Sequence, residues 1–194
     1  MKLVGLTGDI GAGKSTVDAL LAARGAVIVD ADLLYREVVE PEVLPALVER
    51  FGPSVRTASG KLDRPALAKV VFHDDAARKD LNAITGPFIV RAIAAAVAEH
   101  AGSDKVVIVD VALMRKKEQY GVELMVVVTA PVEVRVTRLV EQRGMSEEDA
   151  RARVAAQQAE YGDRAAVADV VIDNAGSRAD LEKQVDALWH RLTA

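Results

Sequence analysis

The sequence predicts an α/β protein with a parallel sheet, and three observations support that fold class. Five short apolar runs, most of them rich in Val and Ile, have the length of strands buried on both faces. Helical patterns separate these runs, as in alternating βα units. The first run leads through a glycine-rich loop directly into a helical pattern. The runs are residues 2–6, 26–29, 106–109, 124–128 and 170–172.

The loop after the first run matches a phosphate-binding P-loop, because residues 8–15 fit G-x-x-x-x-G-K-[ST]. Its strand–loop–helix context favours this interpretation over the alternative, a glycine-rich turn that binds nothing. Backbone N–H groups and the helix N-terminus would face the phosphates of a nucleoside triphosphate. Lys14 would reach the β- and γ-phosphates, and the Ser15 hydroxyl would ligate Mg²⁺. The expected nucleotide-binding residues are Gly8, Gly11, Ala12, Gly13, Lys14, Ser15 and Thr16.

Two acids follow the second run directly, in the sequence Asp30-Ala31-Asp32. Ligands of open α/β sheets collect beyond the carboxyl ends of the strands, so we expect both acids near the mouth of the P-loop. In an extended segment, alternation would point the two side chains the same way. Such a carboxylate could take the proton of an attacking hydroxyl or hold Mg²⁺. The alternative is a helix N-cap, a position at which Asp is favoured.

Residues 35–100 have little strand pattern and much helical pattern, and they are too many for a simple crossover. We expect them to form a second, helical lobe over the edge of the sheet. Prolines should break this segment into short elements. These are Pro41, Pro45, Pro53 and Pro65. With no internal repeat and no linker, the chain is expected to be one domain with two helical excursions, the second at 131–161.

Asp110 closes the third run, where a Walker-B-type acid would hold the Mg²⁺ shell beside the P-loop serine. The second excursion is rich in arginine, and an Arg fork can stabilise the charge of a migrating phosphoryl group. Arg138 and Arg143 are the candidates for that role. The alternative is that these arginines pair with nearby acids on solvated helix faces.

The last helical pattern places Leu181, Val185, Leu188 and Leu192 on one face, with Ser177 in position to cap its start. The three histidines have no metal-like spacing, and we expect each to be a surface or core residue. They are His73, His100 and His190.

Composition narrows the classes of function. The net charge of −4 and the pI near 5.5 argue against a broad surface for nucleic acid or anionic membrane. The chain has no cysteine, which excludes disulfides, thiolate catalysis and Cys-based metal sites. A reducing cytosol fits that absence. The short apolar run after Met1 predicts neither a signal peptide nor a membrane span, so we expect a cytoplasmic protein.

The P-loop and further motifs along nearly the whole chain resemble those of the dephospho-CoA kinase family. They occupy residues 6–8, 10–15, 30–32, 36–39, 51–52, 60–64, 81–82, 138–146, 157 and 168–174. The resemblance implies a P-loop kinase with a five-stranded parallel sheet, which uses ATP and Mg²⁺ to phosphorylate the ribose 3′-hydroxyl of dephospho-CoA. It further implies a core at about 1–34, 101–130 and 165–194, an acceptor-binding lobe at about 35–100 and a mobile lid at about 131–164. Asp32 would be the base at the acceptor hydroxyl, Arg138 and Arg143 would belong to the lid, and Asn174 would lie by the adenine.

The chain departs from the family pattern mainly where the acceptor should bind. Asp9 replaces a glycine in the P-loop, Gly86-Pro87 replaces a His-Pro pair, and Lys116 replaces an acid. A carboxylate at position 9 carries an electrostatic cost unless it faces a cation or an acceptor group. The expected acceptor-binding residues are Asp9, Arg36, Gly86 and Lys116. Two alternatives therefore stay open, namely a kinase of the same fold acting on another small-molecule hydroxyl and a non-catalytic nucleotide-binding module.

Overall fold

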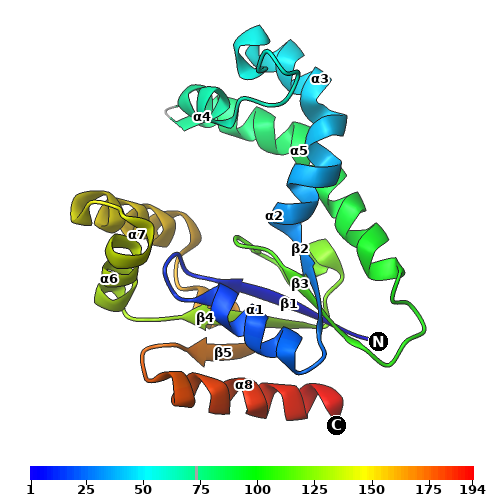
Figure 1. Ribbon diagram of the computed structural model, residues 1–194, viewed down its shortest axis with the longest axis vertical. Helices are drawn as coiled ribbons and strands as arrows, with labels where there is room; N and C mark the ends of the chain where they lie inside the picture. Colours follow the sequence, from blue (N-terminus) through cyan, green and yellow to red (C-terminus); the bar gives the residue numbers. More distant parts are fainter. Residues whose placement is uncertain (73) are drawn as a thin grey trace. The chain divides into compact units, whose positions relative to one another are not determined.

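The computed structural model describes residues 1–72 and 74–194, so the expectation for His73 lies outside the described residues. Two compact units make up the chain (Figure 1). The first contains Met1–Val29 and His100–Ala194, and the second contains Asp30–Glu99. The second unit therefore begins five residues before the expected lobe of 35–100, and the expected lid at 131–164 is part of the first unit.

The sheet has five parallel strands in the order β2-β3-β1-β4-β5, which confirms the predicted fold class. The strands are β1 Lys2–Gly8, β2 Val27–Asp30, β3 Val106–Asp110, β4 Leu124–Thr129 and β5 Val170–Asp173. The register pairs Leu6 of β1 with Asp110 of β3 and with Val126 of β4. Because β1 is central, the loop that follows it starts at the middle of the carboxyl edge, with the end of β3 beside it.

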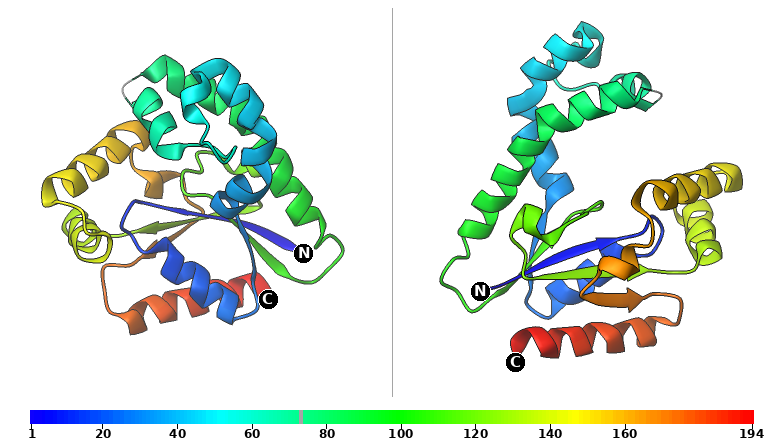
Figure 2. Two further views of the ribbon diagram at one scale, coloured as in Figure 1. Left: turned by 45° about the horizontal axis from the view of Figure 1, so that its top comes forward. Right: turned by 180° about the vertical axis from the view of Figure 1, so that it is seen from behind.

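Helices α1 (Lys14–Ala23) and α8 (Arg178–Thr193) lie side by side against one face of the sheet (Figures 1 and 2). Alternate strand residues such as Val4 and Leu6 supply the sheet side of this core, as the period of two requires. The predicted face of α8 is confirmed, since Leu181, Val185, Leu188 and Leu192 are all buried. Ser177 caps α8 in a capping box with Asp180, which satisfies the first backbone N–H groups.

The second helical excursion forms two helices, α6 (Val132–Arg143) and α7 (Glu147–Tyr161). Gly144 ends α6 with a φ of +64°, and the Ser146 side chain caps α7. A small core of its own holds the pair together. It consists of Val136, Leu139, Ala150 and Val154. The remaining short elements of this unit are the 3₁₀ turns η3 (Lys117–Tyr120) and η4 (Arg164–Val167).

The second unit is helical, as expected. Its elements are α2 Ala31–Leu34, the π-helical η1 Tyr35–Val39, α3 Glu40–Phe51, the 3₁₀ turn η2 Pro53–Val55, α4 Arg64–Phe72 and α5 Asp75–Ala98. Val43 and Leu47 of α3 are buried in its core, with Phe88 and Ile89 of α5 packed against them.

Two local expectations for this unit are wrong. Pro45 does not break the chain, because it lies inside α3. Its ring removes one backbone hydrogen bond, and the burial of Val43 and Leu47 on either side offsets that loss. The segment after Asp30 is not extended, because α2 begins at Ala31, so alternation does not apply to Asp30 and Asp32.

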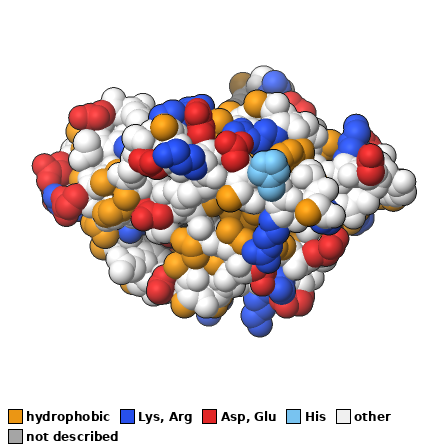
Figure 3. Space-filling view, turned by 90° about the horizontal axis from the view of Figure 1, so that it is seen from below, with side chains coloured by type: hydrophobic (Ala, Val, Ile, Leu, Met, Phe, Trp, Pro, Cys, Tyr) orange, Lys and Arg blue, Asp and Glu red, His pale blue; other side chains and the backbone are white. Residues whose placement is uncertain are grey.

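Helix α5 is long and apolar enough to cross a membrane by length and composition alone, which the sequence analysis did not anticipate. The core helices of soluble proteins pass the same test. Here Phe88, Ile89 and Ala92 pack against the core of the second unit, and Ile93 is buried. Packing therefore accounts for part of its apolar character. On the face shown in Figure 3, acidic and basic side chains are interspersed with apolar ones.

Candidate active site

The P-loop joins the end of β1 to the start of α1. Gly11 and Gly13 have φ values of +77° and +91°, a region that side chains with a Cβ rarely adopt. Space is also restricted, because a Cβ on Gly11 would lie 2.7 Å from the carbonyl oxygen of Arg135 and one on Gly13 would collide with the Asn174 amide. The backbone N–H of Thr16 donates to the Gly13 carbonyl at 3.0 Å, so the N–H groups of Lys14 and Ser15 are the ones that the start of α1 offers to a phosphate.

Lys14 forms an ion pair with Asp110, the acid that ends β3. Its ammonium also lies 3.6 Å from a carboxylate oxygen of Asp18, one turn further along α1. Asp110 is buried, and Asp18 is nearly so. The structure thus brings together two predicted site residues, Lys14 and Asp110, and adds a third group that sequence reasoning missed. The i, i+4 spacing of Lys14 and Asp18 on the helix was a signal that could have found it.

Burial raises the pKa of the Asp18 carboxyl from 3.8 to about 7, and the negative charge of Asp110 adds to this effect. Lys14 acts in the opposite direction. One oxygen of Asp18, Oδ1, is buried without a hydrogen-bond partner among the described residues. One lysine therefore faces two carboxyl groups. The carboxylate oxygens around Lys14 outnumber the hydrogen-bond donors that face them.

That excess fits a hard cation. Mg²⁺ prefers oxygen ligands and is usually held by one or two carboxylates together with substrate phosphates. The Ser15 hydroxyl and the Asp110 carboxylate can supply oxygen ligands of this kind, and Asp18, which has the oxygen without a partner, interacts with Asp110. No group of three or more His, Cys, Asp or Glu side chains able to hold a metal occurs among the described residues. Any Mg²⁺ would thus depend on the nucleotide for further ligands.

Arg138 and Asn174 both bind the P-loop backbone. The Asn174 amide donates a 2.7 Å hydrogen bond to the carbonyl oxygen of Ala12. Arg138 donates to the same oxygen at 3.2 Å and to the Asn174 carbonyl at 2.9 Å. Two predicted site residues thus brace the loop that carries Lys14. The adenine contact expected of Asn174 and the phosphate contact expected of Arg138 stay predictions.

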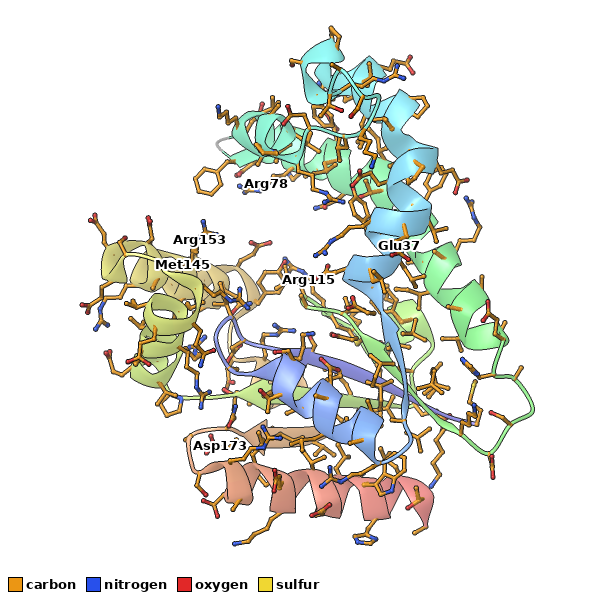
Figure 4. All side chains as sticks on the ribbon, viewed as in Figure 1. Glu37, Arg78, Arg115, Met145, Arg153 and Asp173 are labelled. Carbon is orange, nitrogen blue, oxygen red and sulfur yellow. The ribbon has the colours of Figure 1, made fainter. Side chains whose placement is uncertain are left out.

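The other arginines of α6 and α7 divide between surface and interior. Arg143 is exposed at the end of α6, and Arg153 is exposed on α7 (Figure 4). Arg151 pairs with Glu133 at 2.8 Å and with Glu147 at 2.9 Å, so the solvated-face alternative holds for this residue. Arg135 is buried against the P-loop.

Asp9, the acid in place of a P-loop glycine, faces cations. Its Oδ2 lies 3.8 Å from Arg135 and accepts a 3.0 Å hydrogen bond from the Thr129 hydroxyl. It also interacts electrostatically with Arg164, whose pKa burial lowers and Asp9 raises. Arg135 and Arg164 are 6% and 5% exposed, so each needs a nearby negative charge or acceptor. The Asp9 carboxylate thus faces cations, which offsets the electrostatic cost expected of an acid in the P-loop.

Arg164 connects the P-loop to the segment after β3, a role that sequence reasoning missed. Its guanidinium donates to the Gly8 carbonyl at 2.8 Å and to the Ala112 carbonyl at 3.2 Å, and it also bonds the Thr7 hydroxyl. An isolated arginine after a helix gives no sequence signal for such burial.

Lys116 lies in the first unit and lines a pocket of about 260 Å³ together with Arg115, Tyr161 and Arg164. Arg115, on the segment after β3 (Figure 4), stacks over the Tyr161 ring at 4.2 Å. The Lys116 side chain has no ion pair with any described residue. Lys116, in place of the family's acid, thus adds a positive charge to a pocket that Arg115 and Arg164 also line.

The remaining predicted residues belong to the second unit. The Asp30 carboxylate caps α2 by accepting from the backbone N–H groups of Asp32 and Leu33, so the capping alternative is correct for Asp30. Asp32 is exposed in the first turn of α2, and Arg36 is exposed one turn later. Gly86 lies inside α5, where a Cβ would meet open space, so none of the described residues around it requires a glycine there.

A sequence model of the dephospho-CoA kinase family matches residues 2–180. This chain belongs to that family. A dephospho-CoA kinase of Mycolicibacterium paratuberculosis is 50% identical over 193 residues, which cover 98% of this chain and 47% of the relative. One from Streptomyces avermitilis is 47% identical over 97% of this chain and 93% of its own length. A crystal structure of a Thermus thermophilus protein matches with a TM-score of 0.84 at 33% identity, over 100% of this chain and 98% of that one.

The chain spans about half the length of the mycobacterial relatives that it matches, at 47% of their residues. It spans nearly all of the Streptomyces relative. The activity of the chain and the roles of the individual side chains follow below as proposals.

Proposed function

We propose that this chain transfers the γ-phosphate of ATP to the ribose 3′-hydroxyl of dephospho-CoA, giving CoA and ADP. Family membership over residues 2–180 is the observation that carries the proposal. The site supports it, because a P-loop with a charged lysine between two acids is equipped for triphosphate chemistry.

Phosphoryl transfer leaves little covalent work for a protein, so positioning and charge stabilisation dominate. The backbone N–H groups at the start of α1 and the Lys14 ammonium would hold the β- and γ-phosphates. Arg138 and Asn174 keep that backbone in place through the Ala12 carbonyl. Mg²⁺, when bound near Ser15 and Asp110, would neutralise charge on the phosphate oxygens.

The acceptor oxygen needs a group to take its proton, and we assign this role to Asp32. The 3′-oxygen bonds to the γ-phosphorus while the bond from that phosphorus to the β,γ-bridging oxygen breaks, and the proton passes to the Asp32 carboxylate. Asp32 is exposed, and its carboxylate has no hydrogen bond or ion pair with any described residue, so it can accept a proton. Arg138 and Arg143 would meet the charge of the migrating group as the α6–α7 segment closes and excludes water.

The proposal is tested with a panel of hydroxyl acceptors, ATP and Mg²⁺, read by product mass. We expect dephospho-CoA to gain one phosphate and nucleosides or sugars to gain none at matched concentration. Turnover of another hydroxyl compound in preference to dephospho-CoA would assign the chain a different acceptor. Tight ATP binding with no product from any acceptor would favour a non-catalytic module. We also propose that the activity is cytoplasmic, as the lack of cysteine allows.

A further inference from the structure

The first half of the P-loop is attached to the α6–α7 pair at Ile10. The Ile10 side chain packs against the small core that holds the two helices together. Its backbone N–H donates a 2.7 Å hydrogen bond to the side-chain oxygen Oε1 of Gln157, near the end of α7. The loop and the two helices are neighbours in both sets of ribbon views (Figures 1 and 2). Both contacts lie inside the first unit.

The peptide group between Asp9 and Ile10 is held at both of its ends. Its oxygen, the Asp9 carbonyl, accepts a 3.0 Å hydrogen bond from the Ala12 N–H of the same loop. Its nitrogen, the Ile10 N–H, donates to Gln157. A peptide group is planar, so these two bonds together fix its orientation. One of the two comes from the loop itself, and the other comes from a helix more than a hundred residues away in sequence.

The N–H groups that follow this peptide are the ones available to a phosphate. Those of Gly11 and Gly13 have no hydrogen bond with any described residue, and those of Lys14 and Ser15 begin α1. Such groups bind a phosphate when they point inward together. Gly11 has a φ of +77° and no Cβ to restrict its rotation, so contacts outside the residue must set the direction of its N–H. The bond from Ile10 to Gln157 is the contact immediately before it.

The chemistry of glutamine suits this position. A backbone N–H can only donate, so its partner must present an acceptor, which the side-chain carbonyl of Gln157 does. This carbonyl is neutral, whereas a carboxylate at the same place would repel a bound triphosphate. Gln157 is half-buried. The next residue, Gln158, is exposed, and its side chain has no hydrogen bond with any described residue.

We propose that Gln157 is a positioning residue for the nucleotide, which holds the Asp9–Ile10 peptide so that the free N–H groups of the loop converge on the β- and γ-phosphates. It acts through the loop and does not touch the reacting atoms. Because Gln157 belongs to α7, the same bond couples the affinity for ATP to the position of the α6–α7 pair. The inference rests on the proposed function, in which ATP is the phosphate donor.

The test compares two neighbouring glutamines of α7. Gln157→Met keeps a side chain of similar length without the acceptor, and Gln158→Met makes the same replacement at an exposed position. Gln157→Glu keeps an oxygen that can accept from the Ile10 N–H. Hydrogen exchange of the Ile10 amide, followed by NMR on the chain without nucleotide, reports the bond itself. Titration calorimetry with ATP and Mg²⁺ reports the affinity.

We expect Gln157→Met to speed exchange at Ile10 and to weaken ATP binding, each by about tenfold, the loss typical of a hydrogen bond whose donor is left unpaired. Gln158→Met should match the wild type in both measurements. Gln157→Glu should restore slow exchange, and its exchange rate is the readout because its charge would also repel the phosphates. In steady-state kinetics, Gln157→Met should raise the KM for ATP and leave kcat unchanged. Loss of folded protein would lower kcat instead.

Equal exchange at Ile10 in Gln157→Met and Gln158→Met, or equal Kd values for ATP, would overturn the inference. A lower kcat with an unchanged KM for ATP would also overturn it, because Gln157 would then act at the chemical step. Failure of the proposed function would appear separately, as a wild-type chain that binds ATP and does not phosphorylate dephospho-CoA.

Discussion

The ammonium of Lys14, at the start of α1, forms an ion pair with the carboxylate of Asp110, at the end of β3. This contact links the P-loop to the neighbouring strand without a nucleotide. A triphosphate must therefore compete with Asp110 for the lysine. Once Lys14 binds the phosphates, the Asp110 carboxylate is available to a cation. Binding of ATP with Mg²⁺ would therefore replace the Lys14–Asp110 ion pair by a lysine–phosphate pair and a carboxylate–Mg²⁺ pair.

Replacing the P-loop lysine should abolish most of the activity. In Lys14→Ala, the β- and γ-phosphates lose their cation, while Asp110 and Asp18 stay buried without a counter-charge. We expect kcat for CoA formation to fall by about 10²–10³, the usual loss for one electrostatic donor at a transition state. Steady-state kinetics at saturating ATP measure it. A kcat within about twofold of the wild-type value would mean that Lys14 does not serve the phosphates.

Asp18 should make stability depend on pH. Since its pKa is raised from 3.8 to about 7, the folded chain keeps a proton that the unfolded chain releases at lower pH. The free energy of unfolding should therefore decrease as the pH rises between these two values. Asp18→Asn cannot ionise, so its Tm relative to wild type should be higher at about pH 8 than at about pH 5.

The expected difference is a few degrees, because about 1 kcal/mol shifts the Tm of a chain of this size by about 2–4 °C. Thermal melts of both proteins without nucleotide at the two pH values provide the measurement. A Tm difference between variant and wild type that does not change with pH would rule out a raised pKa at Asp18.

Restoring glycine at position 9 should destabilise this chain. Asp9→Gly leaves Arg135 and Arg164 buried without their acid and leaves the Thr129 hydroxyl without its acceptor. Removing one partner of a fully buried pair costs about 3–5 kcal/mol, and the 3.8 Å separation from Arg135 suggests a smaller loss, on the order of 1–3 kcal/mol. Asp9→Asn keeps an acceptor for the Thr129 hydroxyl, so its free energy of unfolding should lie between those of wild type and Asp9→Gly. Urea unfolding measures the effect, and a glycine variant as stable as wild type would show that Asp9 is not needed as a counter-charge.

Asn174 should matter as a hydrogen-bond donor. Its amide donates to the Ala12 carbonyl, so Asn174→Ala removes one brace from the P-loop and should raise the KM for ATP by roughly tenfold. Asn174→Asp should be worse than the alanine variant, because an ionised carboxylate would face the Ala12 carbonyl with no proton to donate. If the aspartate variant bound ATP as well as wild type, the bond to Ala12 would have no part in shaping the loop.

Sequence periodicity was sufficient to predict the sheet, because strands such as Val106–Asp110 are continuous apolar runs and the P-loop places β1 before α1. It was insufficient after Asp30, where a side chain that caps its own helix ended the strand. Pro45 was misjudged because burial of its neighbours outweighs one lost hydrogen bond.

Some site residues could likewise be predicted from the sequence, and others could not. Lys14 and Asp110 were predicted from motifs, whereas Asp18 and Arg164 owe their importance to burial and to partners distant in sequence. Arg164 contacts residues more than a hundred positions away, and no local pattern encodes such a contact. Asp9 could be recognised as a departure, but its counter-ions became evident only in the folded chain.

The central claim is transfer of one phosphate from ATP to the 3′-oxygen of dephospho-CoA, with Asp32 taking the proton. The direct measurement is the position of the new phosphate by ³¹P and ¹H NMR, made for wild type and for Asp32→Asn. We predict a 3′-phosphate with one ADP per CoA for wild type, and for the variant a rate lower by about 10²–10⁴ with ATP affinity unchanged. A phosphate at another position, no new phosphate, or an Asp32→Asn variant as fast as wild type would contradict the account.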